Sequence, residues 1–263
     1  AAAKPSSKVY VVTGATDGIG RLTAQKLGQD HHHVAVHGRT KSKVDAVVAE
    51  VEQGGGTARG FVADLSSMAD VRRLGAEIAE AYDSIDGLLN NAGTFSGDYT
   101  GKRVVTEEGN EYSLAVNVLA PFLLTSLLLD RVRASGAGRI LVTSSMSAGA
   151  ADALNDLQCE RWSEHRAYSL SKLCCAMIAM ELQAQQDLEY EEALASATHE
   201  RRTQEEKAKA LAQLQLVRDT CSSEKQELQG EVTALQRELE RCYLAASVLH
   251  SLRLLCLRTQ CCN

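Results

Sequence analysis

Short apolar runs rich in β-branched residues alternate with longer segments of helical period along the first half of the chain. The runs predict strands at residues 9–13, 34–37, 59–63, 85–90 and 139–143. The segments between them predict helices that begin near Gly18, Lys41, Met68 and Glu107, with apolar residues at steps of three and four. Because strands that alternate with helices indicate βαβ units, we expect an α/β fold with a Rossmann-type, doubly wound parallel sheet.

The composition and the apolar pattern of the sequence change after about Leu182. From there to Leu257 the chain has no proline, one glycine, Gly230, and many Gln, Glu, Lys and Arg residues without any strand period. This pattern predicts one long helix, or two. We therefore expect an α/β domain at residues 1–182, which ends after the fifth strand and the following helix, and a helical extension at residues 183–263.

A heptad row runs along this extension. Counting in steps of three and four gives Leu211, Leu214, Arg218, Cys221, Lys225, Leu228, Val232, Leu235, Leu239, Cys242, Ala246 and Leu249. The row is about 60 Å long at 1.5 Å per residue, which is typical of a coiled coil, but Arg218 and Lys225 weaken it. Two interpretations stay open: a coiled coil that joins copies of the chain, or a helix that packs on its own domain or frays.

Composition narrows the classes of function. The chain is 44% apolar and 24% charged, as in a globular protein, and its net charge of −6 argues against a nucleic-acid partner. No run of about 18 apolar residues predicts a membrane span, and the first residues lack the apolar core of a secretory signal, so we expect a cytoplasmic protein. None of the eight cysteines has zinc-ligand spacing, so we expect reduced thiols and no metal.

A glycine-rich turn joins the first strand to the first helix in the string VYVVTGATDGIG, residues 9–20. Gly14, Gly18 and Gly20 permit a tight turn and a close approach of the backbone to a pyrophosphate at the helix N-terminus. The same glycines also suit an ordinary strand–helix turn. The flanking strand and helix favour cofactor binding.

Three further strand ends carry candidate cofactor contacts. After the second strand, Arg39, helped by Lys41 or Lys43, is able to neutralise a 2′-phosphate, whereas NAD would call for an acidic residue there. This favours NADP over NAD, although a solvated basic helix start has the same residues. Asp64 is placed to bind the adenine amine, and Asn90, Ala92 and Gly93 of the NNAG string, to line the adenosine ribose.

The candidate catalytic pair is Tyr168 and Lys172 in YSLSK, on a helix that begins near Glu164. Four residues apart, they share one helix face, so the ammonium is able to lower the phenol pKa from its reference near 10. Ser145, with Ser144 as the alternative, ends the fifth strand, where a hydroxyl can donate to a carbonyl oxygen while Tyr168 moves the proton. Asn117 is either a satisfied buried amide or the anchor of a relay water near Lys172.

TGATDGIG, NNAG, Asn117, the TSS string and YSLSK, in this order and spacing, resemble the short-chain dehydrogenase/reductase family from Lys8 to about Leu182. Residues 106–129 and 154–173 are similar to its retinol dehydrogenase branch. The resemblance implies NADP and apolar alcohol or aldehyde substrates, including retinoids and steroids. It also implies a catalytic tetrad of Ser145, Tyr168, Lys172 and Asn117, and cofactor positions at Gly14, Gly18, Ile19, Gly20, Arg39, Asp64, Asn90 and Gly93.

The chain departs from that family pattern after Leu182. The family continues into a sixth strand with a Pro-Gly turn, a substrate lid and a seventh strand, none of which the sequence predicts here. The fifth strand is then expected at a sheet edge. In DHHH, residues 30–33, the family normally has a glycine with positive φ, and Asp or His there costs about 1 kcal/mol.

Two functions follow from these patterns. One is an NADP-dependent oxidoreductase that transfers hydride between the nicotinamide and a small, apolar carbonyl or alcohol substrate. The other is a catalytically impaired nucleotide-binding remnant whose helical tail mediates oligomerisation or partner binding. The abrupt change near Leu182 also fits an altered reading of the gene.

Overall fold

The computed structural model describes residues 7–95 and 102–260, with side chains described to residue 234 and at 236 and 237. The chain divides into two compact units, Ala1–Asp187 and Leu188–Asn263.

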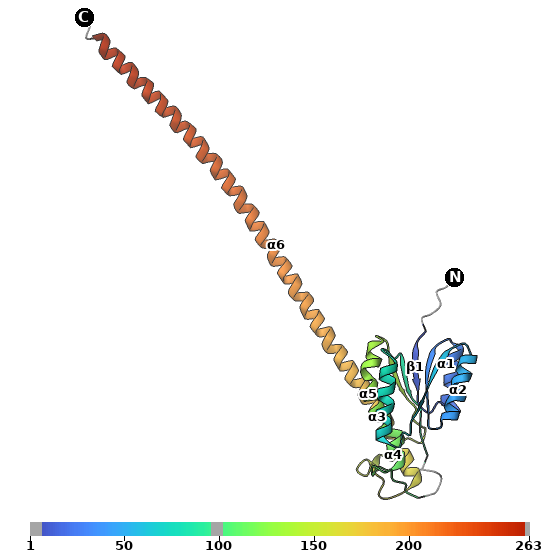
Figure 1. Ribbon diagram of the computed structural model, residues 1–263. Coiled ribbons are helices and arrows are strands. Elements are labelled where there is room, and N and C mark those ends of the chain that lie inside the picture. Colours follow the sequence, from blue (N-terminus) through green and yellow to red (C-terminus); the bar gives the residue numbers. More distant parts are fainter. Residues whose placement is uncertain (1–6, 96–101, 261–263) are drawn as a thin grey trace. The chain divides into compact units, whose positions relative to one another are not determined.

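The first unit is built on a parallel sheet. Its strands are β1 (Val9–Val12), β2 (His33–Gly38), β3 (Thr57–Val62), β4 (Gly87–Asn90) and β5 (Arg139–Val142), in the order β3-β2-β1-β4-β5 (Figure 1). Because β1 pairs with β2 on one side and β4 on the other, the order of connection reverses there and opens a crevice beyond the strand ends. The predicted doubly wound α/β fold is confirmed.

Helices cover both faces of this sheet. The helical segments of the chain include α1 (Gly18–Gln29), α2 (Lys41–Gln53), α3 (Met68–Ala81), α4 (Tyr112–Leu114), α5 (Ala120–Ala134), the short 3-10 turn η3 (Ala151–Ala153) and α6 (Glu164–Gln260). Figure 1 shows α1 and α2 on one face and α3 and α5 on the other. Adjacent residues of β1 serve opposite faces: Val12 packs with Val44 and Val51 of α2, and Val11 packs with Leu124 of α5. Burying each such side chain contributes about 1.5–3 kcal/mol.

The helix predicted to begin near Glu107 begins instead at Tyr112. A turn precedes it, in which Gly109 has φ +85° and donates its N–H to the carbonyl of Thr106. Glu111 then caps the helix, since its carboxylate accepts from the N–H groups of Ser113 and Leu114. That cap fixes the first helical residue, and the prediction failed because apolar period alone does not locate a cap.

Between α4 and α5 the chain makes one π-helical turn, η2 (Ala115–Leu119), closed by a bond from the Ala120 N–H to the Ala115 carbonyl. Pro121 has no N–H, so the carbonyl of Asn117 lacks its α-helical donor. Single π-helical turns of this kind occur frequently at functional sites.

Tyr112–Ala134 is long and apolar enough, by length and composition, to cross a membrane, which the sequence analysis did not foresee. Half of that stretch is buried, and Leu124, Leu128 and Val132 belong to the core beside the sheet. The core helix of an α/β unit passes the same test, so the stretch is weak evidence for a span.

The end of α1 contains the predicted strained residue. His31 adopts φ +62°, the left-handed region, and one of its ring nitrogens lies 3.0 Å from the carbonyl oxygen of Gly55. Position 31 is therefore the residue of the DHHH string that a glycine would suit best.

The sheet ends at β5, which pairs with β4 alone, and no strand follows it among the described residues. The Leu141 side chain is 51% exposed there. The first turns of α6 pack against β5 through Cys175 and Ile178, which contact Val142 in a small apolar cluster. The edge strand expected from the sequence is present.

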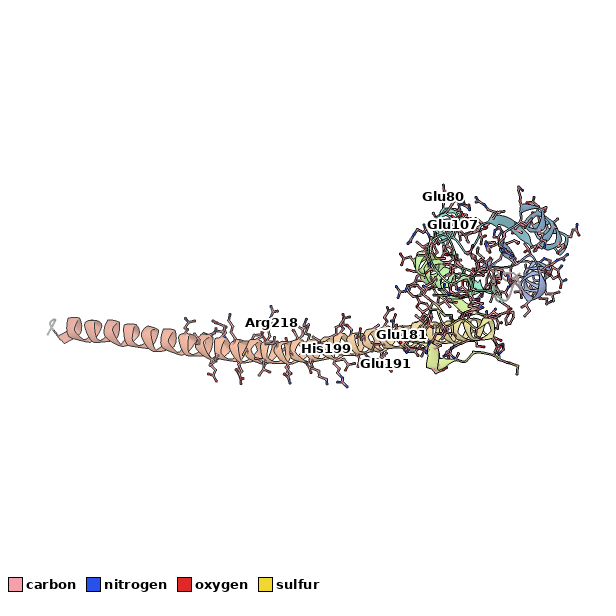
Figure 2. All side chains as sticks on the ribbon, turned by 90° about the horizontal axis from the view of Figure 1, so that it is seen from below. Glu80, Glu107, Glu181, Glu191, His199 and Arg218 are labelled. Atoms are coloured by element: carbon pink, nitrogen blue, oxygen red, sulfur yellow. The ribbon has the colours of Figure 1, made fainter. Side chains whose placement is uncertain are left out.

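In the second unit the chain is helical as far as Gln260, as the sequence predicted. Its apolar side chains, including Leu211, Leu214, Leu228 and Val232, are exposed. Figure 2 shows the side chains of Glu191, His199 and Arg218 projecting from the helix.

Candidate active site

A cleft of about 700 Å³ lies at the carboxyl ends of the central strands, within the range of small-molecule sites. Predicted residues that line it are Gly14, Gly18, Arg39, Asp64 and Gly93. Residues that the sequence analysis did not single out also line it, among them His37, Asn91, Thr94, Phe95 and Tyr112.

Two of the three glycines in the turn, Gly14 and Gly20, have no room for a side chain. Gly14 and Gly18 have φ of +62° and +49°. A Cβ on Gly14 would lie 2.8 Å from the Cα of Ala92, and a Cβ on Gly20 would overlap the carbonyl oxygen of Gly14. The backbone of Gly14 and Gly18 therefore lies at the cleft beside the N-terminus of α1, together with the side chains of Thr16 and Asp17, and a backbone placed in this way is able to accept a pyrophosphate.

Side chains hold this turn from the β4 side. The Thr13 hydroxyl accepts from the N–H groups of Asn91 and Ala92 at 3.0 and 3.1 Å. The Asn91 amide donates to the carbonyls of Thr13 and Gly14 at 3.1 and 3.3 Å. The only sequence signal for Asn91 was its place in the NNAG string.

His37 holds the turn from the β2 side. Its Nδ1 lies 3.3 Å from the Gly14 nitrogen, and its Nε2 lies 3.2 Å from the Ala63 carbonyl oxygen. Burial lowers the pKa of His37 to about 4, so the ring is neutral, with Nδ1 as acceptor and Nε2–H as donor. No pattern in the sequence separates His37 from an ordinary strand-end residue.

Two polar residues lie where the adenosine half of a dinucleotide is expected. The Arg39 guanidinium donates to the Tyr112 hydroxyl at 3.3 Å, and both residues line the cleft. The Asp64 carboxylate accepts from the N–H and the hydroxyl of Ser66, both at 2.9 Å. Arg39 thus presents a fixed positive charge beside the glycine turn.

Tyr168 and Lys172 lie on α6, at the Phe95 end of the cleft. The Tyr168 ring meets the Phe95 ring edge-on, with centroids 4.9 Å apart, and Phe95 lines the cleft. Lys172 is 4% exposed, and its Nζ lies 5.8 Å from the centroid of the Tyr168 ring. The ammonium donates to the carbonyl of Thr143 at 2.9 Å and lies 3.1 Å from where a Cβ on Gly93 would be.

The two candidate serines differ in their partners. The Ser144 hydroxyl donates to the main-chain carbonyl of Lys172 at 3.0 Å. The Ser145 hydroxyl lies 2.9 Å from that of Ser147 and accepts the Ser147 N–H at 3.2 Å. Either hydroxyl of this pair is able to be the donor, and when Ser147 donates, the Ser145 O–H is available for another oxygen.

Asn117 lies in the π-helical turn and joins three segments. Its side chain bonds the main chain of Thr94, and its Nδ2 also donates to the Ser171 hydroxyl of α6 at 2.9 Å. Burial raises the pKa of the Cys175 thiol, which donates at 2.9 Å to the Asn117 carbonyl that Pro121 leaves free. Asn117 therefore ties the loop after β4 to the helix of Tyr168.

The family model for short chain dehydrogenase matches residues 8–190. The chain belongs to the short-chain dehydrogenase family. Among curated relatives, human retinol dehydrogenase 13 is 35% identical over 183 residues, 66% of this chain and 53% of that protein. Polyprenol dehydrogenase of Mus musculus is 36% identical over 184 residues, 67% of this chain and 54% of that protein. The chain thus spans about half the length of the curated relatives it matches.

Solved structures agree on the fold. A short-chain dehydrogenase from Sphingobium yanoikuyae in complex with NADPH has a TM-score of 0.55 and 26% identity, covering 68% of this chain and 65% of that one. An alcohol dehydrogenase from Thermococcus sibiricus complexed with 5-hydroxy-NADP has a TM-score of 0.56, 23% identity and coverage of 68% and 72%. The resemblance of residues 8–182 to this family is confirmed.

Three predicted cofactor residues are not among the residues that line the cleft. Asn90 is buried in β4 and donates to the Thr125 hydroxyl of α5 at 3.0 Å, so Asn91, on the opposite side of the chain, lines the cleft instead. Ile19 is 66% exposed at the start of α1. Gly20 lies beneath the turn and acts by leaving space for Gly14.

Within residues 7–95 and the described part of 102–260, no group of three or more His, Cys, Asp or Glu side chains is arranged to hold a metal ion. The residues present do fit a dinucleotide, because Gly14 and Gly20 accept no Cβ and Arg39 borders the same cleft. The site is therefore suited to binding a dinucleotide cofactor.

Proposed function

We propose that the first unit is an NADP-dependent oxidoreductase acting on a small carbonyl or alcohol substrate. The single observation that carries the proposal is one cleft that joins the glycine turn to Phe95, against which the Tyr168 ring packs. A bound dinucleotide and a general acid would then face one substrate carbonyl.

The preference for NADP over NAD rests on Arg39. A guanidinium is suited to a phosphate because it donates planar, charge-assisted hydrogen bonds. Its bond to Tyr112 keeps it beside the cleft. Relatives solved with NADPH and 5-hydroxy-NADP are compatible with this choice.

In this proposal the bound NADPH supplies the hydride that adds to the carbonyl carbon. The Tyr168 hydroxyl gives its proton to the carbonyl oxygen, and the Ser145 hydroxyl donates a hydrogen bond to that oxygen. The Lys172 Nζ lies 5.8 Å from the centroid of the Tyr168 ring, so a positive charge stands beside the group that gives up the proton. In the oxidative direction the phenolate takes the proton from the alcohol.

We further propose that the substrates are apolar alcohols or aldehydes. Phe95 packs on Tyr168, and relatives are named for retinol and polyprenol. An apolar wall beside the proton donor favours such substrates over charged ones.

The test compares the wild type with Tyr168→Phe. We expect both to bind NADPH with equal affinity in a fluorescence titration, whereas the variant loses at least about 100-fold in turnover of retinal or decanal. Tyr82→Phe, which changes a tyrosine bonded to His33, is the matched control and keeps its turnover. Equal turnover by Tyr168→Phe would rule out the assigned chemistry.

A second proposal is that the chain is a nucleotide-binding remnant whose tail mediates association. It is favoured by the exposed apolar side chains of the heptad row, because such side chains become buried when the helix pairs with another helix. They include Leu211, Leu214, Leu228 and Val232. Sedimentation of the full chain is expected to give a higher mass than the double variant Leu214→Glu, Leu228→Glu. Identical masses would remove the associating tail.

A further inference from the structure

His37 is the only histidine that lines the cleft among the described residues, and it is 2% exposed. Its ring bridges the end of β3 and the turn after β1. Nε2–H donates to Ala63, and Nδ1 accepts from Gly14.

The bond to Gly14 has a counterpart on the same peptide group. The carbonyl of Thr13 and the N–H of Gly14 belong to one peptide unit. The Asn91 amide binds the carbonyl end at 3.1 Å, and His37 binds the N–H end at 3.3 Å. Side chains from the ends of β4 and β2 thus hold the two ends of this unit.

This peptide unit precedes the residue that most needs holding. Gly14 has φ +62° and no side chain, so its flanking peptides rotate more freely than those of other residues. A rotated Thr13–Gly14 peptide would point its carbonyl or its N–H in a new direction, and an anion at the turn is sensitive to that direction.

We propose that His37 is a positioning residue for the cofactor: by accepting the Gly14 N–H, it fixes the rotation of the Thr13–Gly14 peptide and so preforms the pyrophosphate site. The proposal rests on the proposed binding of a dinucleotide. It requires the neutral ring, because a proton on Nδ1 would face the Gly14 N–H as a second donor. Burial keeps the ring neutral at pH 7.

Substitutions at position 37 distinguish the loss of the hydrogen-bond acceptor from the loss of the aromatic ring. His37→Asn puts an amide oxygen close to the position of Nδ1, so it keeps an acceptor for Gly14 but loses the bond to Ala63. His37→Phe keeps the ring and loses both bonds. His37→Leu is a smaller replacement without an acceptor, for use if phenylalanine prevents folding.

The experiment titrates NADPH and NADH into the full chain by fluorescence and records the urea unfolding of each apo variant. We expect the affinity for the better cofactor to fall at least tenfold in His37→Phe or His37→Leu and less than threefold in His37→Asn. His37→Asn and the Phe or Leu variants are all expected to lose stability in the absence of cofactor. If His37 had only a structural role, the affinity for the cofactor would therefore not differ between them in this way.

The outcomes separate the two proposals. If the wild type binds neither cofactor, the proposed function fails. If the wild type binds and the folded Phe or Leu variant binds equally well, or if His37→Asn is as weak as His37→Phe, the role of the Gly14 bond is overturned.

Discussion

Both polar atoms of the Asn117 side chain bond the main chain of Thr94. The Oδ1 atom accepts the Thr94 N–H at 2.8 Å, and Nδ2 donates to the Thr94 carbonyl at 2.9 Å. Because Nδ2 also donates to Ser171, next to Lys172, one amide sets the distance between the loop after β4 and α6. These bonds satisfy a 1% exposed amide, which was one of the two interpretations of Asn117 from the sequence.

Replacing this amide is expected to cost stability. Asn117→Ala leaves the Thr94 N–H and carbonyl without their partner, and we expect the free energy of unfolding to fall by about 2–4 kcal/mol. Urea denaturation measures the change. Asn155→Ala, at an exposed position, is the control and should stay within about 0.5 kcal/mol of the wild type. A similarly small change in Asn117→Ala would contradict the assigned hydrogen bonds.

Cofactor preference is expected to follow the charge at residue 39. Arg39→Asp should raise the dissociation constant for NADPH at least about tenfold, because a carboxylate repels the 2′-phosphate. The dissociation constant for NADH should not rise. Tyr112→Phe, which removes the acceptor for Arg39, should have a smaller effect in the same direction. Fluorescence titration with both cofactors measures the ratio.

Lys41→Ala is the control for that experiment. The Lys41 ammonium already pairs with Asp45 at 2.7 Å on α2, so its removal should change the preference little. If Lys41→Ala shifts the ratio more than Arg39→Asp does, the 2′-phosphate binds elsewhere on the basic string of residues 37–43.

Local sequence determined most of the sheet and the glycine turn. Runs such as VYVV have an apolar surface on both faces, and a strand buried between two helical layers needs exactly that pattern. Likewise, glycine is the only residue without a Cβ, so the crowded positions Gly14 and Gly20 were visible in the sequence.

Contacts between distant segments could not be predicted in the same way. His37 and Gly14 are 23 residues apart, and Asn117 and Thr94 are also 23 residues apart, so no periodicity reports either bond. Which of the two asparagines, Asn90 or Asn91, lines the cleft depends on the face of the β4 chain that each occupies. The exact end of that strand decides the face, and a shift of one residue inverts it.

Stability is expected to depend on pH through His37. Its pKa is about 4 in the folded chain and about 6.5 when unfolded, so the unfolded chain binds more protons between these values. Stability should therefore be fully present above about pH 6.5 and fall as the pH approaches 4, by on the order of 3 kcal/mol for this group. His33, whose pKa burial also lowers, acts in the same direction.

The measurement compares urea unfolding at pH 7.5 and pH 5 in the wild type and in His37→Asn. Asparagine does not titrate, so the variant should lose less stability between the two pH values. Equal losses in both proteins would mean that other groups cause the acid sensitivity.

The residue after α1 offers a stabilising substitution. His31 has φ +62°, where a side chain is strained, and His31→Gly should raise the free energy of unfolding by about 0.5–1 kcal/mol. The gain is expected to exceed the loss of the bond between the His31 ring and Gly55, because an exposed bond is worth about 0.5 kcal/mol, the low end of the usual range. His32→Gly is the matched control, because His32 is not among the residues with positive φ, and glycine there adds freedom to the unfolded chain and removes the ring contact with Tyr10. We expect urea denaturation to give opposite signs for the two variants, and a loss of stability in His31→Gly would show that the ring contact with Gly55 outweighs the backbone strain.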